Sequence, residues 1–185
     1  MCTAITYQTR DFYFGRNLDL ERGYGEGVVV TPRSFPIPLR FLPGLEKHYA
    51  MIGMAAVSSG YPLFADAMNE KGLCMAGLNF PHSAVYAPAQ EGDVASFELI
   101  PYILGRCATV AEAKAALAEV RVCDTAFSAA FPPTKLHWMV ADATGSIVVE
   151  AVDDAIQGGE IDYDTLVALE KDAEGRVTAL KSDMA

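Results

Sequence analysis

The sequence predicts an α+β fold, in which antiparallel strands pair through short turns and two helices follow each other along the chain. β-Branched and aromatic runs occupy residues 2–31, 49–58, 74–81 and 135–152, while helical patterns are confined to residues 97–120. Strands and helices grouped in this way favour an antiparallel sheet. Apolar residues make up 51% and charged residues 21% of the 185-residue chain, which is typical of a globular domain with a sizeable core.

The first two strands are expected to form a hairpin. The runs CTAITYQT and FYFGRNL flank the polar pair at residues 10–11, which predicts a two-residue turn. In that register paired residue numbers sum to 21, so Cys2 faces Asp19. Alternation then puts Arg16 and Asp19 on opposite faces. Both reach Cys2 only if the second strand is irregular, with Gly15 as the expected bulge, or if Asp19 lies beyond its end.

The middle of the chain is predicted to alternate strands and loops. GVVVT at residues 27–31 predicts a third strand, and the segment at 32–48 is an extended loop because four prolines fall in its first twelve residues. YAMIGMAAVS predicts a buried strand. GYPLFADAMNEKGL is interpreted as a loop and turn, and CMAGLNFP as another strand.

Two helices and a final hairpin follow. Ser96 precedes FELIPYILGR, a predicted helix in which Pro101 removes one backbone hydrogen bond. Thr109 and Glu112 have the spacing of a capping box, which predicts the start of a second, alanine-rich helix. KLHWMVADATGSIVVEAV predicts a strand, a turn at DATG and a strand. The second helix is expected to bury the face formed by Val110, Ala113, Leu117 and Val120.

The chain is predicted to divide at residue 150. Residues 1–150 form the main domain, whereas residues 151–185 hold nine acidic and three basic side chains and form a separate acidic tail. Within this tail, TLVALEKDAEGRVTALK predicts a hairpin around DAEG.

Charge and cysteine content exclude several classes of function. The net charge of −10 disfavours nucleic acid and anionic membrane surfaces as partners. We find neither a secretory signal nor an apolar run long enough to span a membrane, and we expect a cytoplasmic protein. Cys74, Cys107 and Cys123 lack metal-ligand spacing and are interpreted as packing residues, so no metal or cofactor is predicted.

Cys2 is the residue best suited to nucleophilic chemistry. Removal of Met1 would leave a thiol and a free α-amine on one residue, with ordinary pKa values near 8.5 and 8, so that the amine can act as base for the thiol. A nearby cation would favour the thiolate. Spacing recommends no dyad with His48, His82 or His137. From spacing alone, an inert second-position cysteine and a solvated RNLD strand end remain open alternatives.

Longer motifs resemble one family. MCTAITY…YFGRNLDL, TPRSFPIPLRF, YPLFADAMNEKGLCMAGLNFP, FELIPYILGRC and LHWMVADATGSIVVE resemble the choloylglycine hydrolases, which include bile salt hydrolases and penicillin V acylases. The resemblance extends from Met1 to about Glu150. It implies an N-terminal-nucleophile hydrolase fold, an αββα sandwich of two antiparallel sheets between helical layers, and hydrolysis of a small-molecule amide.

The same resemblance implies roles for individual residues. Cys2 is the nucleophile and its amine the base, Arg16 lies beside the sulfur, and Asp19 holds the amine. Asn79 contributes to the oxyanion site. With an asparagine at this position the chain resembles bile salt hydrolases more than penicillin V acylases. We therefore rank conjugated bile salts above penicillin V as substrates. The candidate substrate-binding residues are Tyr24, Phe35, Phe64 and Phe131.

The sequence also departs from the family, whose members are longer. They carry a second oxyanion asparagine and a later arginine, whereas no asparagine follows Asn79 here. We therefore expect an incomplete sandwich, weakened amidase activity and pairing with another copy as a homo-oligomer. The alternatives are a penicillin V acylase-type amidase acting on other N-acyl compounds, and a non-catalytic remnant or interaction module.

Overall fold

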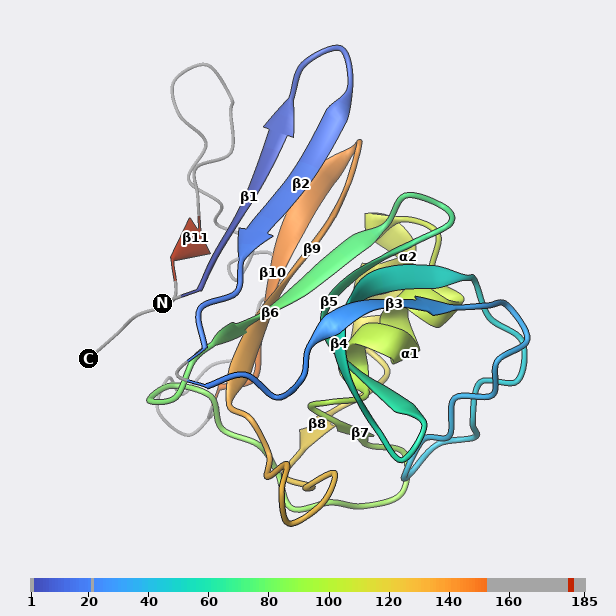
Figure 1. Ribbon diagram of the computed structural model, residues 1–185, viewed down its shortest axis with the longest axis vertical. Helices are drawn as coiled ribbons and strands as arrows, with labels where there is room; N and C mark the ends of the chain where they lie inside the picture. The colour runs from blue at the N-terminus through green and yellow to red at the C-terminus, as the bar shows by residue number, and fades with distance from the viewer. Residues whose placement is uncertain (1, 21, 153–179, 182–185) are drawn as a thin grey trace.

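The computed structural model describes residues 2–20, 22–152 and 180–181 (Figure 1). One six-stranded antiparallel sheet has the order β10-β9-β6-β5-β4-β3, and a three-stranded antiparallel sheet has the order β11-β1-β2. The elements are β1 (Thr3–Gln8), β2 (Phe12–Asn17), β3 (Gly27–Thr31), β4 (Met51–Ser58), β5 (Tyr61–Asn69), β6 (Cys74–Asn79), β7 (Val94–Ala95), α1 (Leu99–Arg106), α2 (Val110–Leu117), β8 (Val122–Cys123), β9 (Leu136–Asp142), β10 (Gly145–Glu150) and β11 (Leu180–Lys181). The predicted tail hairpin lies outside the described residues.

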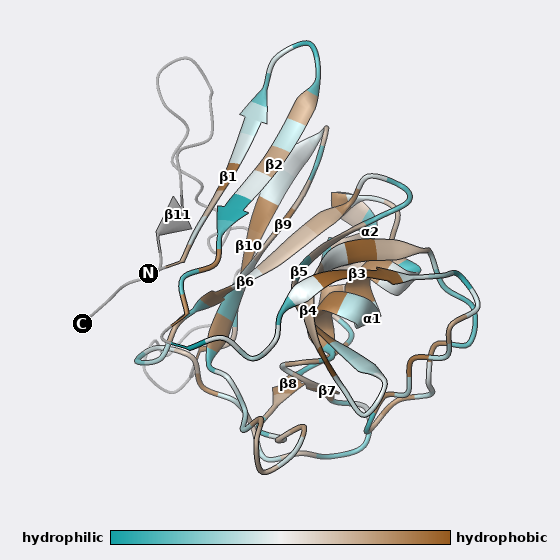
Figure 2. Ribbon diagram, in the orientation of Figure 1, coloured by the Kyte–Doolittle hydropathy of each residue, from teal (hydrophilic) through white to brown (hydrophobic). Residues whose placement is uncertain are grey.

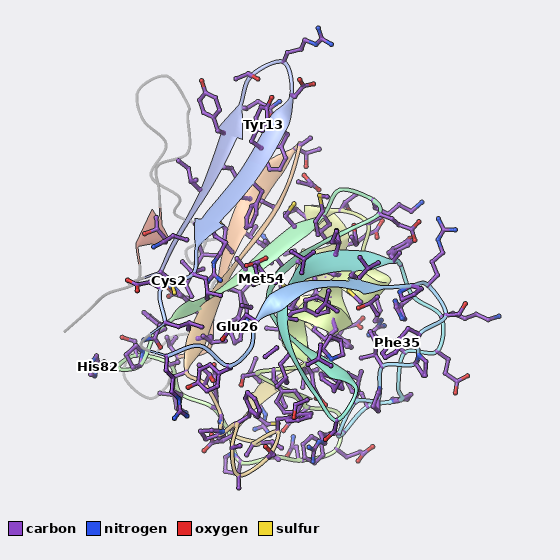
Figure 3. All side chains as sticks on the ribbon, in the orientation of Figure 1. Cys2, Tyr13, Glu26, Phe35, Met54 and His82 are labelled. Atoms are coloured by element: carbon purple, nitrogen blue, oxygen red, sulfur yellow. The ribbon has the colours of Figure 1, made fainter. Side chains whose placement is uncertain are left out.

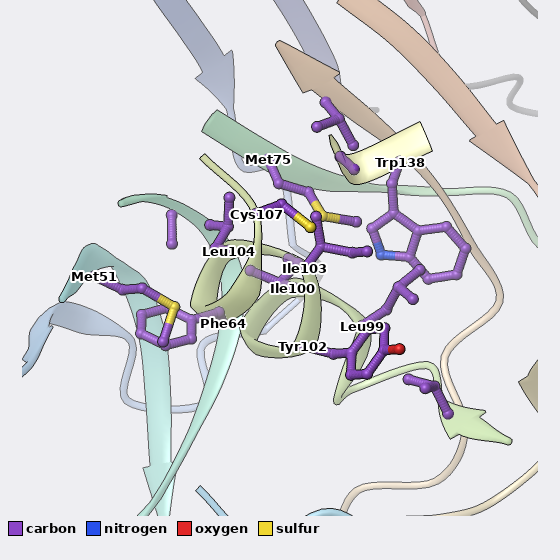
Figure 4. Packing of buried hydrophobic residues seen from close by; sticks show 14 of the residues in the cluster. Met51, Phe64, Met75, Leu99, Ile100, Tyr102, Ile103, Leu104, Cys107 and Trp138 are labelled. Atoms are coloured by element: carbon purple, nitrogen blue, oxygen red, sulfur yellow. The ribbon is translucent and has the colours of Figure 1, made fainter. Parts of the chain in front are cut away.

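The large sheet separates two apolar layers. On one face, α1 contacts β4, β5 and β6, and its side chains pack with Met75 and Trp138 in the main core (Figure 4). On the other face, Ala76, Leu78 and Met139 pack against the small sheet. Successive side chains of β6 and β9 point to opposite faces of the sheet, and both faces are buried, so apolar residues are needed at consecutive positions. In the described residues neither helix is long and apolar enough to cross a bilayer.

The N-terminal hairpin is real, but its predicted register is wrong by one residue. Thr3 pairs with Asn17, Ala4 with Arg16 and Ile5 with Gly15, so paired numbers sum to 20. The cause is a three-residue loop at residues 9–11, closed by a hydrogen bond from the Thr9 amide to the carbonyl of residue 11 at 2.9 Å. Gly15 therefore lies in regular pairing, and the bulge predicted there is absent from the described pairing of β1 and β2.

The segment interpreted as a loop at residues 60–73 instead contains β5, a nine-residue strand at the centre of the sheet. Pro62 is the second residue of β5, and a proline is tolerated close to the start of a strand. Only the turn after β5 was predicted correctly. There Asn69, 2% exposed, donates to the carbonyls of Leu104 (2.8 Å) and Cys107 (2.7 Å) and accepts from two amides of the turn.

The two helices begin differently. Thr109 Oγ1 accepts from the Glu112 amide at 3.2 Å, which confirms the predicted helix start, and Ala113 is buried as expected. The Asp142 carboxylate also accepts from the Val110 amide at 2.7 Å, which ties α2 to the end of β9. In contrast, α1 begins after residue 98 without a side-chain cap. Its proline is the third helical residue, where no intrahelical N–H bond is lost.

Candidate active site

Cys2 is buried between the two sheets at the beginning of β1 (Figure 3). It is 4% exposed and packs in a cluster with Ala4, Ala76, Leu78 and Met139. The apolar contacts come from the inner face of β6 and β9, so the small sheet is what covers this face. The thiol therefore lies in the layer between the sheets and not on a solvated chain end.

Arg16 lies on the same face as Cys2. Alternation makes Cys2 and Ala4 share a face of β1, and Ala4 is the partner of Arg16 across the hairpin. The Arg16 side chain is 7% exposed, and its Nη2 donates to the Gly77 carbonyl at 2.6 Å. A one-residue change of register inverts which face a side chain occupies, so the corrected register is what brings this guanidinium to the thiol's side.

Asp66 completes this arrangement and was missed by the sequence analysis. Its Oδ2 lies 3.2 Å from Arg16 Nη1, and its Oδ1 accepts from the Met54 amide at 3.3 Å. The pairing of β4 and β5 is irregular between Met54 and Ala55. Beside it, a Cβ on Gly53 would lie 2.0 Å from the Asp66 carbonyl oxygen, so only glycine permits this approach. The available signal was an acidic residue inside the apolar run YPLFADAMN.

Asp19 and Asn79 are located at strand ends. Asp19 is exposed and lies two residues beyond the end of β2, which is one of the two arrangements considered from the sequence. Asn79 is the exposed last residue of β6. Strict alternation would direct Asn79 away from the face of Leu78 and Cys2. Its role beside the nucleophile therefore depends on the strand ending at this residue, and it stays a prediction.

The four aromatic candidates do not form one group. Tyr24 and Phe131 are in contact, with ring centroids 5.7 Å apart, although they are distant in the sequence. Phe35 lies on the side of the molecule away from Cys2 (Figure 3). Phe64 is 7% exposed and packs in the core beside Met51 (Figure 4), so it is a core residue instead of a surface for substrate.

A buried histidine lies on the strand next to β6. His137 is 5% exposed, pairs with Leu78 across the sheet and stacks on Phe80 with ring centroids 4.6 Å apart. Its Nδ1 is 3.2 Å from Glu150 Oε1. This pair holds β9 and β10 together beside the end of β6.

The other three cysteines are packing residues. Cys74, Cys107 and Cys123 are buried and unpaired by disulfides, as expected for packing residues. Burial raises the pKa of both Cys74 and Cys107 to about 11, which suppresses their thiolate forms. Across the described residues, no group of three histidine, cysteine or acidic side chains is placed to hold a metal ion.

Sequence comparison identifies the family. The profile of the linear amide C–N hydrolases, choloylglycine hydrolase family, matches residues 2–159. The chain belongs to this family. The bile salt hydrolase/transferase of Lactiplantibacillus plantarum is 46% identical over 159 residues, which are 85% of this chain and 49% of that protein. The conjugated bile acid hydrolase of Lactobacillus acidophilus is 39% identical over 155 residues, covering 81% and 49%.

Solved structures agree with this choloylglycine hydrolase assignment. The crystal structure of a variant conjugated bile acid hydrolase from Clostridium perfringens superposes with a TM-score of 0.76 at 38% identity, covering 83% of this chain and 49% of that one. Penicillin V acylase from Agrobacterium tumefaciens gives a TM-score of 0.64 at 25% identity, covering 82% and 47%. The predicted family and fold class are thus confirmed. The chain spans about half the length of the relatives it matches.

Proposed function

We propose that this choloylglycine hydrolase chain is a thiol amidase that acts on glycine- or taurine-conjugated bile salts, with Cys2 as nucleophile. One observation carries the proposal: the Cys2 thiol and the Arg16 guanidinium share the buried face between the sheets. The substrate class follows from the bile salt hydrolase/transferase that is 46% identical to this chain. The predicted division into residues 1–150 and an acidic tail stays a prediction.

The reaction would proceed through a thioester. After removal of Met1, the α-amine takes the Cys2 thiol proton while sulfur attacks the amide carbonyl carbon. The tetrahedral oxyanion is held by the Asn79 amide and backbone N–H groups, each worth about 3–4 kcal/mol in such sites. As the carbon–nitrogen bond breaks, the ammonium returns the proton to the leaving glycine or taurine nitrogen. Water then cleaves the thioester, releasing the bile acid and restoring the thiol.

The charged residues near Cys2 would assist the reaction. A fixed guanidinium attracts the negative charge that develops on the tetrahedral intermediate. Arg16 is suited to this role because Asp66 and the Gly77 carbonyl hold its side chain in one position. Asp19, which follows β2, would orient the α-ammonium by charge attraction.

A second substrate class is penicillin V or another N-acyl compound. The shared fold of the Agrobacterium tumefaciens penicillin V acylase supports this alternative. We rank it lower because the asparagine at position 79 is the residue that resembles bile salt hydrolases. A non-catalytic interaction module is the third possibility, since the relatives are about twice as long as the aligned region.

Turnover separates these alternatives. The protein is incubated with glycocholate, taurocholate and penicillin V, and free glycine, taurine and 6-aminopenicillanic acid are quantified. We expect release from the bile salts, lost in Cys2→Ala and retained in the matched control Cys123→Ala, which alters a buried cysteine of β8. Release that survives Cys2→Ala contradicts the nucleophile assignment. Intact mass spectrometry tests the required loss of Met1, because a retained methionine leaves Cys2 without a free amine.

A further inference from the structure

The imidazole of His137 lies on the same face of the large sheet as the cluster around Cys2. His137 pairs with Leu78 across β6 and β9, and Leu78 packs in that cluster. Met139, two residues further along β9, belongs to the same cluster, so alternation directs the His137 side chain to this face. The end of β6 lies beside the beginning of β1 (Figure 2), which brings this histidine close to the candidate site.

Two contacts fix the imidazole ring in its buried position. Its Nδ1 lies 3.2 Å from Oε1 of Glu150, which pairs with His137 across β9 and β10. Its Nε2 is buried and has no hydrogen-bond partner among the described residues, so Glu150 is the polar contact that orients the ring. The ring also stacks on Phe80, with centroids 4.6 Å apart and planes inclined by 8°, which is a favourable arrangement of two aromatic rings. The face of His137 is therefore a rigid support for Phe80.

Phe80 directly follows Asn79, the predicted oxyanion residue. Asn79 pairs with Leu136 as the last residue of β6, and the Phe80 amide donates to the Lys135 carbonyl at 2.9 Å. The direction of a side chain depends on the backbone conformation around it. Because the stack on His137 holds the residue after Asn79, it fixes the direction in which β6 ends and with it the direction of the Asn79 amide.

We propose that His137 is a positioning residue, which acts through Phe80 to keep the Asn79 amide where it donates to the oxyanion. This inference rests on the proposed amidase function and adds a residue to its machinery. An oxyanion donor is effective only within hydrogen-bond distance of the position that the developing charge occupies. A displacement of about 1 Å costs about a hundredfold in rate. In this role the ring face of His137 is what matters, and its proton is not transferred.

Two substitutions separate the ring from its polar contact. His137→Asn keeps an amide close to the position of Nδ1 but removes the ring, whereas His137→Phe keeps a ring and removes the polar contact. We expect His137→Asn to lower kcat for glycocholate about tenfold with KM nearly unchanged, because the donor acts in the transition state and the Phe80 backbone bond limits its shift. His137→Phe should retain more than about a third of the wild-type kcat, because the stack is kept.

His48→Asn is the matched control. This histidine is also buried, at 8% exposed, but it lies in the loop before β4, and its Nε2 is 2.6 Å from the Phe35 carbonyl oxygen. Its loss should lower stability without changing kcat. A loss of kcat in His48→Asn equal to that in His137→Asn would overturn the proposal, because it would make the effect a general consequence of removing a buried histidine.

A double-mutant cycle tests whether His137 acts through Asn79. In an Asn79→Ala background, adding His137→Asn should lower kcat no further, because the donor that it positions is already gone. Phe80→Leu removes the other ring of the stack and should reproduce the loss, and it tests the proposal if His137→Asn does not fold. An unchanged kcat in Phe80→Leu and His137→Asn, equal losses in His137→Asn and His137→Phe, or additive losses in the cycle would overturn the proposal.

A measurement without turnover keeps this test separate from the amidase proposal. The chain has three asparagines, Asn17, Asn69 and Asn79, so 15N-asparagine labelling gives few side-chain amide signals, and Asn79→Ala identifies the signal of Asn79. We expect His137→Asn to increase the nanosecond mobility of the Asn79 amide, measured by the heteronuclear NOE, and to leave that of Asn69 unchanged. An Asn79 amide that is equally mobile in both proteins overturns the positioning role. Absence of wild-type turnover overturns the amidase proposal alone.

Discussion

The ion pair between Arg16 and Asp66 gives the sharpest prediction. The change Asp66→Asn keeps the shape of the side chain and an oxygen that can accept from the Met54 amide, but it removes the negative charge. The Arg16 guanidinium would then stay buried and still donate to the Gly77 carbonyl, but it would lack the negative charge of Asp66 beside it. We expect this substitution to destabilise the protein and to weaken the link between the two sheets.

The size of the loss follows from the geometry. At 3.2 Å and an effective dielectric constant of about 20, the attraction between the charges is about 5 kcal/mol. The Asp66 side chain is 22% exposed, so water screens part of this attraction, and Asp66 also recovers hydration when the protein unfolds. Removing one partner of a buried pair costs about 3–5 kcal/mol, and the lower value suits this site. For a chain of this length, about 3 kcal/mol lowers Tm by about 6–12 °C.

Thermal unfolding followed by circular dichroism measures this change. The control is Arg33→Gln, which removes a pair between Arg33 and Glu70 in which the arginine side chain is 74% exposed. Exposed pairs contribute little, so the control should unfold close to the wild-type temperature. An Asp66→Asn protein that unfolds at the wild-type temperature, or both variants losing the same amount, would refute the reasoning.

Three further predictions concern other buried groups. At pH 8, Cys74 and Cys107 should react with iodoacetamide about a hundredfold more slowly in the folded protein than in urea, because burial raises their pKa to about 11; Cys2 should react faster than both. Asn69→Ala should cost about 4 kcal/mol in urea unfolding, since four hydrogen bonds are lost. Burial raises the Asp142 pKa, but hydrogen bonds outweigh it and lower that pKa overall. Asp142→Asn should therefore cost about 1 kcal/mol at pH 7, and this cost should shrink as pH falls below 3.8 and through the lowered pKa of the folded protein.

Each of these has an outcome that contradicts it. Peptide mapping that finds Cys74 or Cys107 labelled as fast as Cys2 would remove the distinction between packing and reactive thiols. For Asn69, the control Gln8→Ala alters an exposed amide and should change stability by less than about 0.5 kcal/mol. For Asp142, an equal loss at pH 7 and pH 3 would mean that its charge contributes nothing, because a lowered pKa makes stability fall as pH falls.

The sequence predicted the elements that depend on local signals. The strand at 27–31, the cap at Thr109 and the hairpin whose turn follows Asp142 all agree with the structure, because β-branched runs, capping side chains and turn residues act over a few positions. The first hairpin was predicted, but its register was not. A two-residue and a three-residue loop are both compatible with residues 9–11, and the sequence does not show that a hydrogen bond from the Thr9 amide closes the longer one.

The candidate site was likewise predicted only in part from the sequence. Cys2, Arg16, Asp19 and Asn79 were predicted as site residues from their positions in the chain and from the family resemblance, and their roles stay predictions, whereas Asp66 was overlooked. Its segment has no strict alternation, because β5 is buried on both faces at its start and has exposed Met68 between buried Ala67 and Asn69 at its end. Phe64 shows a related limit of the sequence: an aromatic residue in an apolar run can face a ligand or the core, and only the structure shows that this one packs in the core cluster.

The length of the loop at residues 9–11 determines which face of the hairpin carries Arg16. The loop is exposed and remote from the thiol, and surface loops usually tolerate gain or loss of a residue. Here, however, deleting one residue would send every second side chain of β2 outward, and Arg16 would be carried into solvent with them. The length of this loop thus decides whether a positive charge lies near Cys2 at the opposite end of the hairpin. Natural variants of the loop should therefore differ by substitution and not by insertion or deletion.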